Sequence, residues 1–123
     1  MKLLIVDDSL VIRNKINRNL LKQFESVNRA SNGVEALSIV KSDSPGFITM
    51  DLTMPEMGGV ECIEEIMKMA PNTYILVISA LADKATAVEA LTLGANGFLC
   101  KPFTALQLND AIEKVLELEL YND

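Results

Sequence analysis

The chain has 123 residues, a length that suits one domain with a substantial buried core. Half of its residues are hydrophobic and 23% are charged, which excludes an intrinsically disordered chain. The formal net charge of −6 argues against nucleic-acid binding, and the apolar runs are too short to span a membrane. We therefore expect a single cytoplasmic domain over residues 1–123.

Short runs of strand type alternate with helical patterns five times along the chain. The expected strands cover residues 2–6, 26–30, 46–50, 73–79 and 97–100. The first, third and fourth are nearly continuous apolar runs, as expected for strands that are covered on both faces. The second strand is polar, and we expect it at an edge of the sheet.

Apolar residues at helical spacing fill the segments between the strands. They are, segment by segment, Ile12, Ile16 and Leu20; Val34, Leu37 and Val40 or Lys41; Ile63, Ile66 and Met67; Ala87, Val88, Ala90 and Leu91; and Leu108, Ile112, Val115 and Leu116. Thr104 is placed to cap the last helix. The repeating order predicts an α/β fold, an open parallel sheet with helices on both faces joined by right-handed crossovers.

The first expected helix has an uneven charge. Between residues 9 and 24 the chain carries four cations, Arg13, Lys15, Arg18 and Lys22, and no acid. Lys15, Arg18 and Lys22 lie three and four residues apart and so share one helical face. That face is either an ordinary solvated surface or a docking surface for an acidic or phosphorylated partner.

Histidine is absent from the sequence. This excludes Ser-His-Asp and Cys-His catalysis, zinc held by histidine, and a role as phosphohistidine carrier. Cys62 and Cys100 match no metal or redox spacing, and we expect both to be reduced, buried thiols.

Polar residues follow or close four of the expected strands. Asp7 and Asp8 follow the first strand, and Asp51 follows the third. Ser79 closes the fourth strand, and Lys101 follows the fifth. Because the carboxyl ends of parallel strands form the ligand crevice of open α/β sheets, these side chains should converge there.

Each of these residues alone has an ordinary interpretation, since Asp and Ser cap helices or organise turns and Lys is usually solvated. Together they favour a site for a divalent cation and a phosphoryl group. Asp51 could take the phosphoryl group as an acyl phosphate, and the main-chain carbonyl of Thr53 could reach the metal. The Ser79 hydroxyl could bond a phosphoryl oxygen, and Lys101 could place a positive charge opposite Asp51.

With these residues in place, the chain resembles the receiver domains of two-component response regulators, above all the stand-alone chemotaxis (CheY-like) type. The resemblance covers essentially the whole chain and rests on Asp7-Asp8, Asp51 with Met54-Pro55 and Gly58-Gly59, Ser79-Ala80, Gly94-Ala95, Gly97-Phe98 and Lys101-Pro102-Phe103. It implies a flavodoxin-like three-layer sandwich with five helices and strand order 2-1-3-4-5. It also implies a phosphorylation-dependent signalling switch that catalyses only its own phosphorylation and dephosphorylation.

The same resemblance assigns roles at the site. Asp51 would accept the phosphoryl group from a phosphohistidine on a sensor histidine kinase or a histidine phosphotransfer domain. Mg²⁺ would be bound by Asp8, Asp51 and the Thr53 carbonyl, with Asp7 assisting through water. The peptide bond between Lys101 and Pro102 would be cis.

The resemblance also implies how the switch is read. Ser79 would move toward the phosphoryl group, and Phe98, where many relatives have Tyr, would turn inward without a hydroxyl contact. The surface of the fourth helix, fifth strand and fifth helix would then bind a downstream protein, with Ala85, Thr86 and Glu89 as expected members. We expect a monomer or weak dimer.

The resemblance further implies that the residues two after Asp51 and two after Ser79, here Thr53 and Leu81, flank the path of the attacking water and set the phosphoryl lifetime. The apolar side chain of Leu81 cannot orient water. We therefore expect Leu81→Glu to shorten the lifetime of the phosphorylated state.

Three other interpretations stay open. A haloacid-dehalogenase-like phosphatase would share most of the residue set but needs a second acid where this chain has Thr53. A flavodoxin would need a phosphate-binding loop after the first strand, where Asp7 and Asp8 would repel a phosphate. A catalytically dead scaffold of the same fold is the third. Turnover of free phosphate esters would favour the phosphatase, and a yellow purified protein the flavodoxin.

Overall fold

The computed structural model describes residues 1–80 and 83–118 and contains five strands and five helices in alternation. The strands are β1 (Lys2–Val6), β2 (Ser26–Ala30), β3 (Phe47–Met50), β4 (Tyr74–Ser79) and β5 (Gly97–Cys100). The helices are α1 (Leu10–Leu20), α2 (Gly33–Asp43), α3 (Gly59–Met69), α4 (Lys84–Leu93) and α5 (Ala105–Glu117). The order matches the sequence prediction, and the third and fourth strands each begin one residue later than expected.

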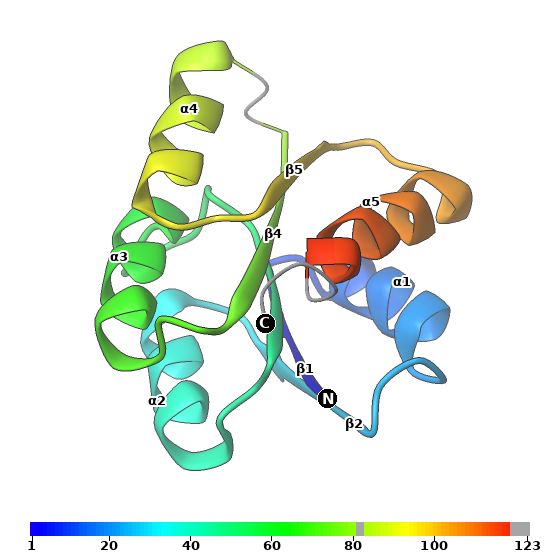
Figure 1. The fold of residues 1–123 in the computed structure, drawn as a ribbon, viewed down its shortest axis with the longest axis horizontal. Coiled ribbons are helices and arrows are strands. Elements are labelled where there is room, and N and C mark those ends of the chain that lie inside the picture. The colour runs from blue at the N-terminus through cyan, green and yellow to red at the C-terminus, as the bar shows by residue number, and fades with distance from the viewer. Residues whose placement is uncertain (81–82, 119–123) are drawn as a thin grey trace.

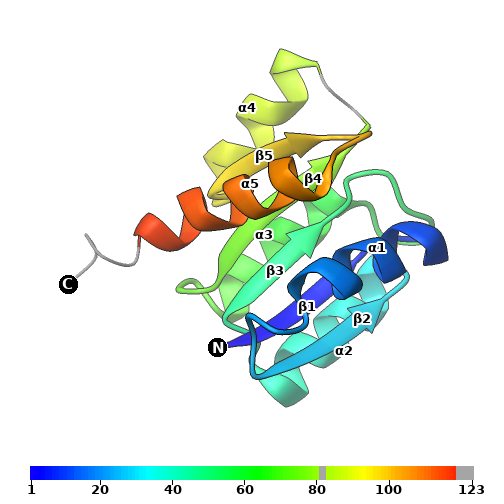
Figure 2. The same ribbon diagram turned by 90° about the vertical axis from the view of Figure 1, so that its right-hand side faces the viewer.

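All five strands are parallel and lie in the order β2-β1-β3-β4-β5. Helices α1 and α5 cover one face of the sheet, and α2, α3 and α4 cover the other (Figure 1). Figure 2 shows the face covered by α1 and α5. The flavodoxin-like three-layer sandwich and the edge position of β2 are thus confirmed. Because the strands run in one direction, their carboxyl ends lie along one edge of the sheet.

Each face of the sheet has its own buried apolar cluster, because successive side chains of a strand point to opposite faces. On β1, Leu4 and Val6 belong to the cluster under α2, α3 and α4, whereas Leu3 and Ile5 belong to the cluster under α1 and α5. Burying one such side chain contributes about 1.5–3 kcal/mol. The central strands are therefore held from both sides, and the positions of their carboxyl ends are fixed.

Side-chain caps begin most of the helices that follow this carboxyl edge. Ser9 caps α1, Asn32 caps α2 and Asp83 caps α4, each by accepting a main-chain N–H three residues on. Thr104 caps α5 in a reciprocal capping box with Gln107, which confirms the cap predicted at Thr104. The caps of α1 and α5 help to fix the loops that carry Asp7, Asp8 and Lys101, whereas α3, which follows the Asp51 loop, begins at Gly58 without a side-chain cap.

The helices are short. The longest, α5, has 13 residues, and within the described ranges no helix has the length and apolarity needed to cross a membrane.

Two predictions about burial are wrong. On α4, Ala90 is buried, but Val88 and Leu91 of the same predicted face are about half exposed, at 51% and 46%. This helix lies toward the β5 side of the sheet, where fewer strands remain to be covered. Cys100 is exposed because it ends the outer strand β5, whereas Cys62 is buried on α3, and burial raises the pKa of its thiol to about 12.

Candidate functional site

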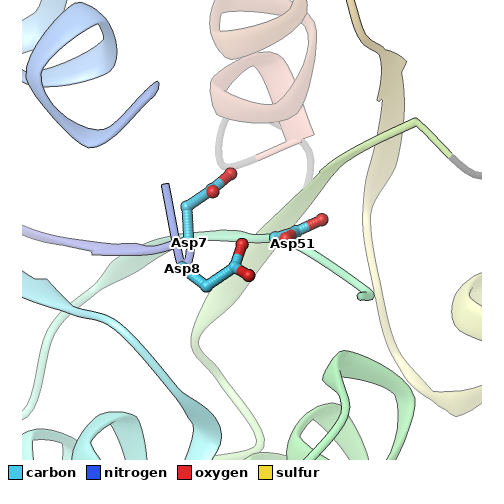
Figure 3. A group of neighbouring side chains, drawn as sticks. All are labelled: Asp7, Asp8 and Asp51. Carbon is cyan, nitrogen blue, oxygen red and sulfur yellow. The ribbon is translucent and has the colours of Figure 1, made fainter. Parts of the chain in front are cut away.

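Three carboxylates converge at the carboxyl edge of the sheet. Asp7 and Asp8 directly follow β1, and Asp51 directly follows the neighbouring strand β3. One oxygen from each lies within 4.8 Å of the other two, and the three carboxylates gather around one point (Figure 3). Asp7 and Asp51 are buried, whereas Asp8 is exposed. The structure thus brings these three predicted residues together.

The ammonium group of Lys101 lies beside two of these carboxylates. Its Nζ is 2.7 Å from Asp7 Oδ2, to which it donates a hydrogen bond, and 3.6 Å from Asp51 Oδ1. The sequence placed Lys101 opposite Asp51, but its shorter contact is with Asp7. The peptide bond between Lys101 and Pro102 is cis, as the resemblance implied.

Both side-chain oxygens of Asp7 already accept hydrogen bonds. Oδ1 accepts the Ser9 N–H at 2.9 Å, and Oδ2 accepts from the Lys101 ammonium. Ser9 in turn caps α1. The capping interpretation of this segment and the acidic-site interpretation are therefore compatible, because different atoms serve the two purposes.

The pKa of Asp51 is raised above its ordinary value. Burial is the largest cause, and the Asp7 carboxylate is the second. The Lys101 ammonium and the hydrogen bond from the Thr53 amide oppose the rise, and Asp8 adds to it. A raised pKa means that the folded structure destabilises the ionised form of the Asp51 carboxyl group. A cation bound among the three carboxylates would offset the repulsion between their negative charges.

The loop after Asp51 brings the main chain very close to the acidic residue. The Thr53 N–H donates to Asp51 Oδ1 at 3.4 Å, and the Gly59 N–H donates to the Leu52 carbonyl at 3.1 Å. A Cβ atom at Gly59 would lie 2.3 Å from the Asp51 carbonyl oxygen, a separation that no real side chain tolerates. Glycine at position 59 is therefore required for the loop to close on Asp51.

The same loop contains an unusual turn. Glu56 has a φ of 68°, in the left-handed region, and the Met57 N–H donates to the Pro55 carbonyl at 2.9 Å. A hydrogen bond between residues two apart closes a γ-turn centred on Glu56. The turn reverses the chain between Asp51 and the start of α3.

The remaining predicted residues lie on the neighbouring strands. Ser79 is fully buried at the end of β4, and its carbonyl accepts the Lys101 N–H at 3.0 Å. Phe98 is half-buried and packs against the cluster under α2, α3 and α4. Leu81 lies outside the described residues. The functional roles of Ser79, Phe98 and Leu81, and that of the Thr53 carbonyl, stay predictions.

Sequence analysis missed two contacts of α1: Arg13 contacts the site itself, and Lys15 contacts the loop beside it. Arg13 donates from a guanidinium nitrogen to the Asp7 carbonyl at 2.7 Å. Lys15 donates to the Phe103 carbonyl and lies 4.3 Å from the centre of the Phe103 ring, beside the loop that carries Lys101. Their position in the second turn after the acidic pair was the available signal, because side chains there can reach back to the preceding loop.

The chemistry of the donors fits a hard divalent cation. The cluster offers carboxylate oxygens, which Mg²⁺ prefers over nitrogen or sulfur. Three carboxylates with one ammonium leave a formal charge of −2, which a divalent cation balances. Burial and neighbouring carboxylates that raise the pKa of an acid, as they do for Asp51, are also common at functional sites.

Comparison with known proteins gives one family. The response regulator receiver domain family matches residues 3–113. The chemotaxis protein CheY of Thermotoga maritima is 41% identical over 115 residues, which cover 93% of this chain and 96% of that protein. The chemotaxis protein CheY of Bacillus subtilis is 39% identical, over 94% of this chain and 97% of that protein.

Solved structures agree with these relatives. A chain of the CheX-CheY-BeF3-Mg²⁺ complex from Borrelia burgdorferi superposes with a TM-score of 0.90 at 28% identity, covering 94% of this chain and 89% of that chain. The chemotaxis protein CheY4 of Vibrio cholerae superposes with a TM-score of 0.86 at 30% identity, covering 93% of this chain and 97% of that chain.

Proposed function

The chain belongs to the response regulator receiver family, and from that premise we propose that Asp51 is its phosphoacceptor and Mg²⁺ its metal. Membership makes the chain a phosphorylation-dependent signalling switch of the chemotaxis CheY type. The observation that supports the assignment of Asp51 is the convergence of three carboxylates and one ammonium at the ends of β1, β3 and β5.

We assign direct metal ligation to Asp8, Asp51 and the Thr53 carbonyl. The support for Asp8 is its exposure, which leaves its carboxylate open to an ion with several waters. Asp7 would act through water, because both its oxygens already accept hydrogen bonds. When bound, Mg²⁺ neutralises the incoming phosphoryl oxygens and the nucleophile together.

In the proposed reaction, an Asp51 carboxylate oxygen attacks the phosphorus of a phosphohistidine. The P–N bond breaks as the new P–O bond forms, and the product is an acyl phosphate on Asp51. Lys101 and Ser79 donate hydrogen bonds to the phosphoryl oxygens, each charge-assisted bond being worth about 1.5–3 kcal/mol. Water later cleaves the acyl phosphate and regenerates Asp51, so the chain acts on no separate substrate.

A phosphodonor partner has an apolar rim to dock on. Leu10 and Val11, just after the acidic pair, are 59% and 76% exposed, and Leu106, just after the Lys101 loop, is 70% exposed. Exposed apolar side chains grouped beside polar ones can form a protein interaction site. We infer that a sensor histidine kinase or a histidine phosphotransfer domain presents its phosphohistidine here. A cytoplasmic location and a monomeric or weakly dimeric state stay predictions.

A second face would read the switch out. Ala85 and Glu89 on α4 are exposed, and Thr86 is partly buried. The Thr86 N–H and hydroxyl both donate to the capping Asp83 carboxylate. We propose that α4, β5 and α5 bind a downstream protein when Ser79 moves and Phe98 repacks. Phe98 lacks a hydroxyl, so its contribution to that surface is packing alone.

Intact-mass measurement tests the central assignment. The chain is incubated with MgCl₂ and a small-molecule phosphodonor, and the expected result is a mass gain of one phosphoryl group that EDTA prevents. Asp51→Asn should abolish the gain. Asp43→Asn, an acid at the opposite edge of the sheet, is the matched control and should keep it.

The outcomes separate the alternatives, which the relatives do not favour. A mass gain that survives in Asp51→Asn would move the acceptor to another residue. No gain in the parent chain would indicate a dead scaffold, and turnover of free phosphate esters would indicate a phosphatase.

A further inference from the structure

The α1 helix reaches back to the acidic pair through one long side chain. Arg13, in the second turn of α1, donates to the main-chain carbonyl of Asp7 at 2.7 Å. This carbonyl belongs to the peptide that joins Asp7 to Asp8. A short, charge-assisted bond to a carbonyl fixes the plane of its peptide, and with it the start of the next residue.

Asp7 is held at every polar atom. Its N–H donates to the Ala30 carbonyl at 3.1 Å, its carboxylate accepts from Ser9 and Lys101, and its carbonyl accepts from Arg13. Asp8 differs, because within residues 1–80 and 83–118 no hydrogen bond or ion pair holds its carboxylate. The direction of the Asp8 side chain therefore depends on the peptide that precedes it.

The charge of Arg13 is also felt at the turn between β2 and α2. The Glu35 carboxylate accepts from the Ser31 N–H at 2.9 Å, at the turn between β2 and α2. The pKa of Glu35 is lowered, mainly by that bond, then by the Ser31 hydroxyl, with a smaller contribution from the charge of Arg13. The Arg13 charge thus acts on the β2–α2 turn as well, although its hydrogen bond is to the Asp7 carbonyl.

We propose that Arg13 is a positioning residue for the metal site, which orients the Asp8 carboxylate through the Asp7–Asp8 peptide. The proposal rests on the proposed function, since it takes Asp8 to be a metal ligand. It divides the basic residues of α1 into two kinds. Arg13 is half-buried and donates a hydrogen bond to the Asp7 carbonyl, whereas the side chain of Arg18 is exposed to solvent.

Charge and orientation predict opposite results when Arg13 is removed. Arg13 is a cation bound to the Asp7 carbonyl, close to the proposed metal site, and its charge repels Mg²⁺. By electrostatics alone, its loss would therefore tighten Mg²⁺ binding. Loss of the hydrogen bond frees the peptide before Asp8 and weakens binding. Residues that orient metal ligands typically change metal affinity 10–100-fold when replaced. The sign of the change therefore tells the two roles apart.

Isothermal titration of the full chain with MgCl₂ gives that sign. We expect Arg13→Met to raise the Mg²⁺ Kd about tenfold. Arg13→Lys keeps a charged donor of similar length and should return the Kd to within about threefold of the parent. Arg18→Met removes the same charge from the same helix without touching the site, and its Kd should stay at the parent value or fall slightly.

Thermal unfolding in EDTA checks that each variant folds, and the rise in Tm on adding MgCl₂ gives a second readout, which should shrink in Arg13→Met. An Arg13→Met chain that binds Mg²⁺ as tightly as the parent, or more tightly, overturns the proposal. So does an Arg13→Lys chain as weak as Arg13→Met. A parent chain that binds no Mg²⁺ overturns the proposed function instead.

Discussion

One cluster of charged side chains lies near the amino ends of the strands and another near their carboxyl ends. The two clusters differ in how well positive and negative charges compensate each other. Near the amino edge, Lys2 Nζ is 3.2 Å from Asp43 Oδ1, and the Asn28 amide donates to the other oxygen of Asp43 at 2.7 Å. One cation, one acid and one amide satisfy each other there. At the carboxyl edge, the Lys101 ammonium pairs with Asp7 and Asp51, and within residues 1–80 and 83–118 no ion pair reaches the third carboxylate, that of Asp8.

The difference is the one we expect between a cluster that stabilises the fold and a cluster that binds a ligand. A cluster with balanced charges and paired oxygens needs nothing from solution, so its role is to hold β1, β2 and α2 together. An unbalanced cluster is held in place by the rest of the fold and becomes favourable only when a ligand binds. Substitutions at the two edges should therefore behave differently.

The largest expected effect is at the carboxyl edge. Gly59→Ala would place a Cβ 2.3 Å from the Asp51 carbonyl oxygen and 2.6 Å from Leu52 Cα. Neither is a flexible side chain, so the loop must move. We expect the free energy of unfolding to fall by about 3 kcal/mol, measured by chemical denaturation, together with loss of phosphorylation.

Two glycines provide controls for that change. At Gly58 a Cβ would meet nothing closer than 3.7 Å, and at Gly46, near the amino edge, it would meet the flexible Met1 side chain. We expect either alanine variant to lose no more than about 1 kcal/mol. Equal losses at all three glycines would contradict the claim that the Asp51 loop is the tightly closed one.

The next effect is a gain in stability. Because burial and the Asp7 charge raise the pKa of Asp51, its ionised form destabilises the folded chain. We expect Asp51→Asn to raise the free energy of unfolding at neutral pH by about 1–2 kcal/mol in EDTA. Adding MgCl₂ should stabilise the parent chain more than the variant.

The pH dependence of this gain has a defined sign. The unfolded carboxyl group has a pKa of about 3.9, and the folded pKa is higher. The penalty is full above the folded pKa, shrinks as the pH falls through it, and is absent below the unfolded pKa. The advantage of Asp51→Asn should therefore be largest near neutral pH and disappear in acid. An advantage that grows on acidification would contradict this account.

The corresponding change at the amino edge should have the opposite sign. Asp43→Ala leaves Lys2 and Asn28 without their shared acceptor. These side chains are partly exposed, so we expect a loss of only about 1 kcal/mol on denaturation. Mg²⁺ affinity and the phosphorylated mass should not change, and a change in either would show that the two edges are coupled.

The smallest effect lies on β3, the strand that carries Asp51. Within residues 1–80 and 83–118 the buried Thr49 hydroxyl has no hydrogen-bond partner. Thr49→Val keeps the shape and removes the unsatisfied group, so we expect a gain of up to about 1 kcal/mol. A clear loss of stability would mean that the hydroxyl is satisfied by a buried water.

The fold was predictable where sequence periodicity reports burial directly. The apolar runs of β1, β3 and β4 are covered on both faces, and their order with the helices determines a parallel sheet. Near β5, the sequence pattern is a poorer guide to burial. Val88, Leu91 and Cys100 are apolar residues that the outer part of the sheet leaves exposed, and the sequence does not say how much strand surface a helix will find.

The site was predictable to the level of which strand ends meet. Parallel strands bring Asp7, Asp8 and Asp51 to one edge whatever the details of packing. Which carboxylate receives the Lys101 ammonium depends on side-chain positions, and the shorter contact goes to Asp7. The hydrogen bond from Arg13 joins it to the Asp7 carbonyl, six residues earlier in the chain. The charge pattern of the helix predicted only an exposed basic face and gave no sign of this contact.

The γ-turn at Glu56 limits what the chain can place there. A φ of 68° suits glycine and asparagine, is tolerated by glutamate, and is strongly unfavourable for β-branched side chains. Tolerance at this position is thus governed by backbone handedness and not by charge. In a saturation library selected for folding, Gly and Asn should persist at position 56, whereas Val and Ile should be lost.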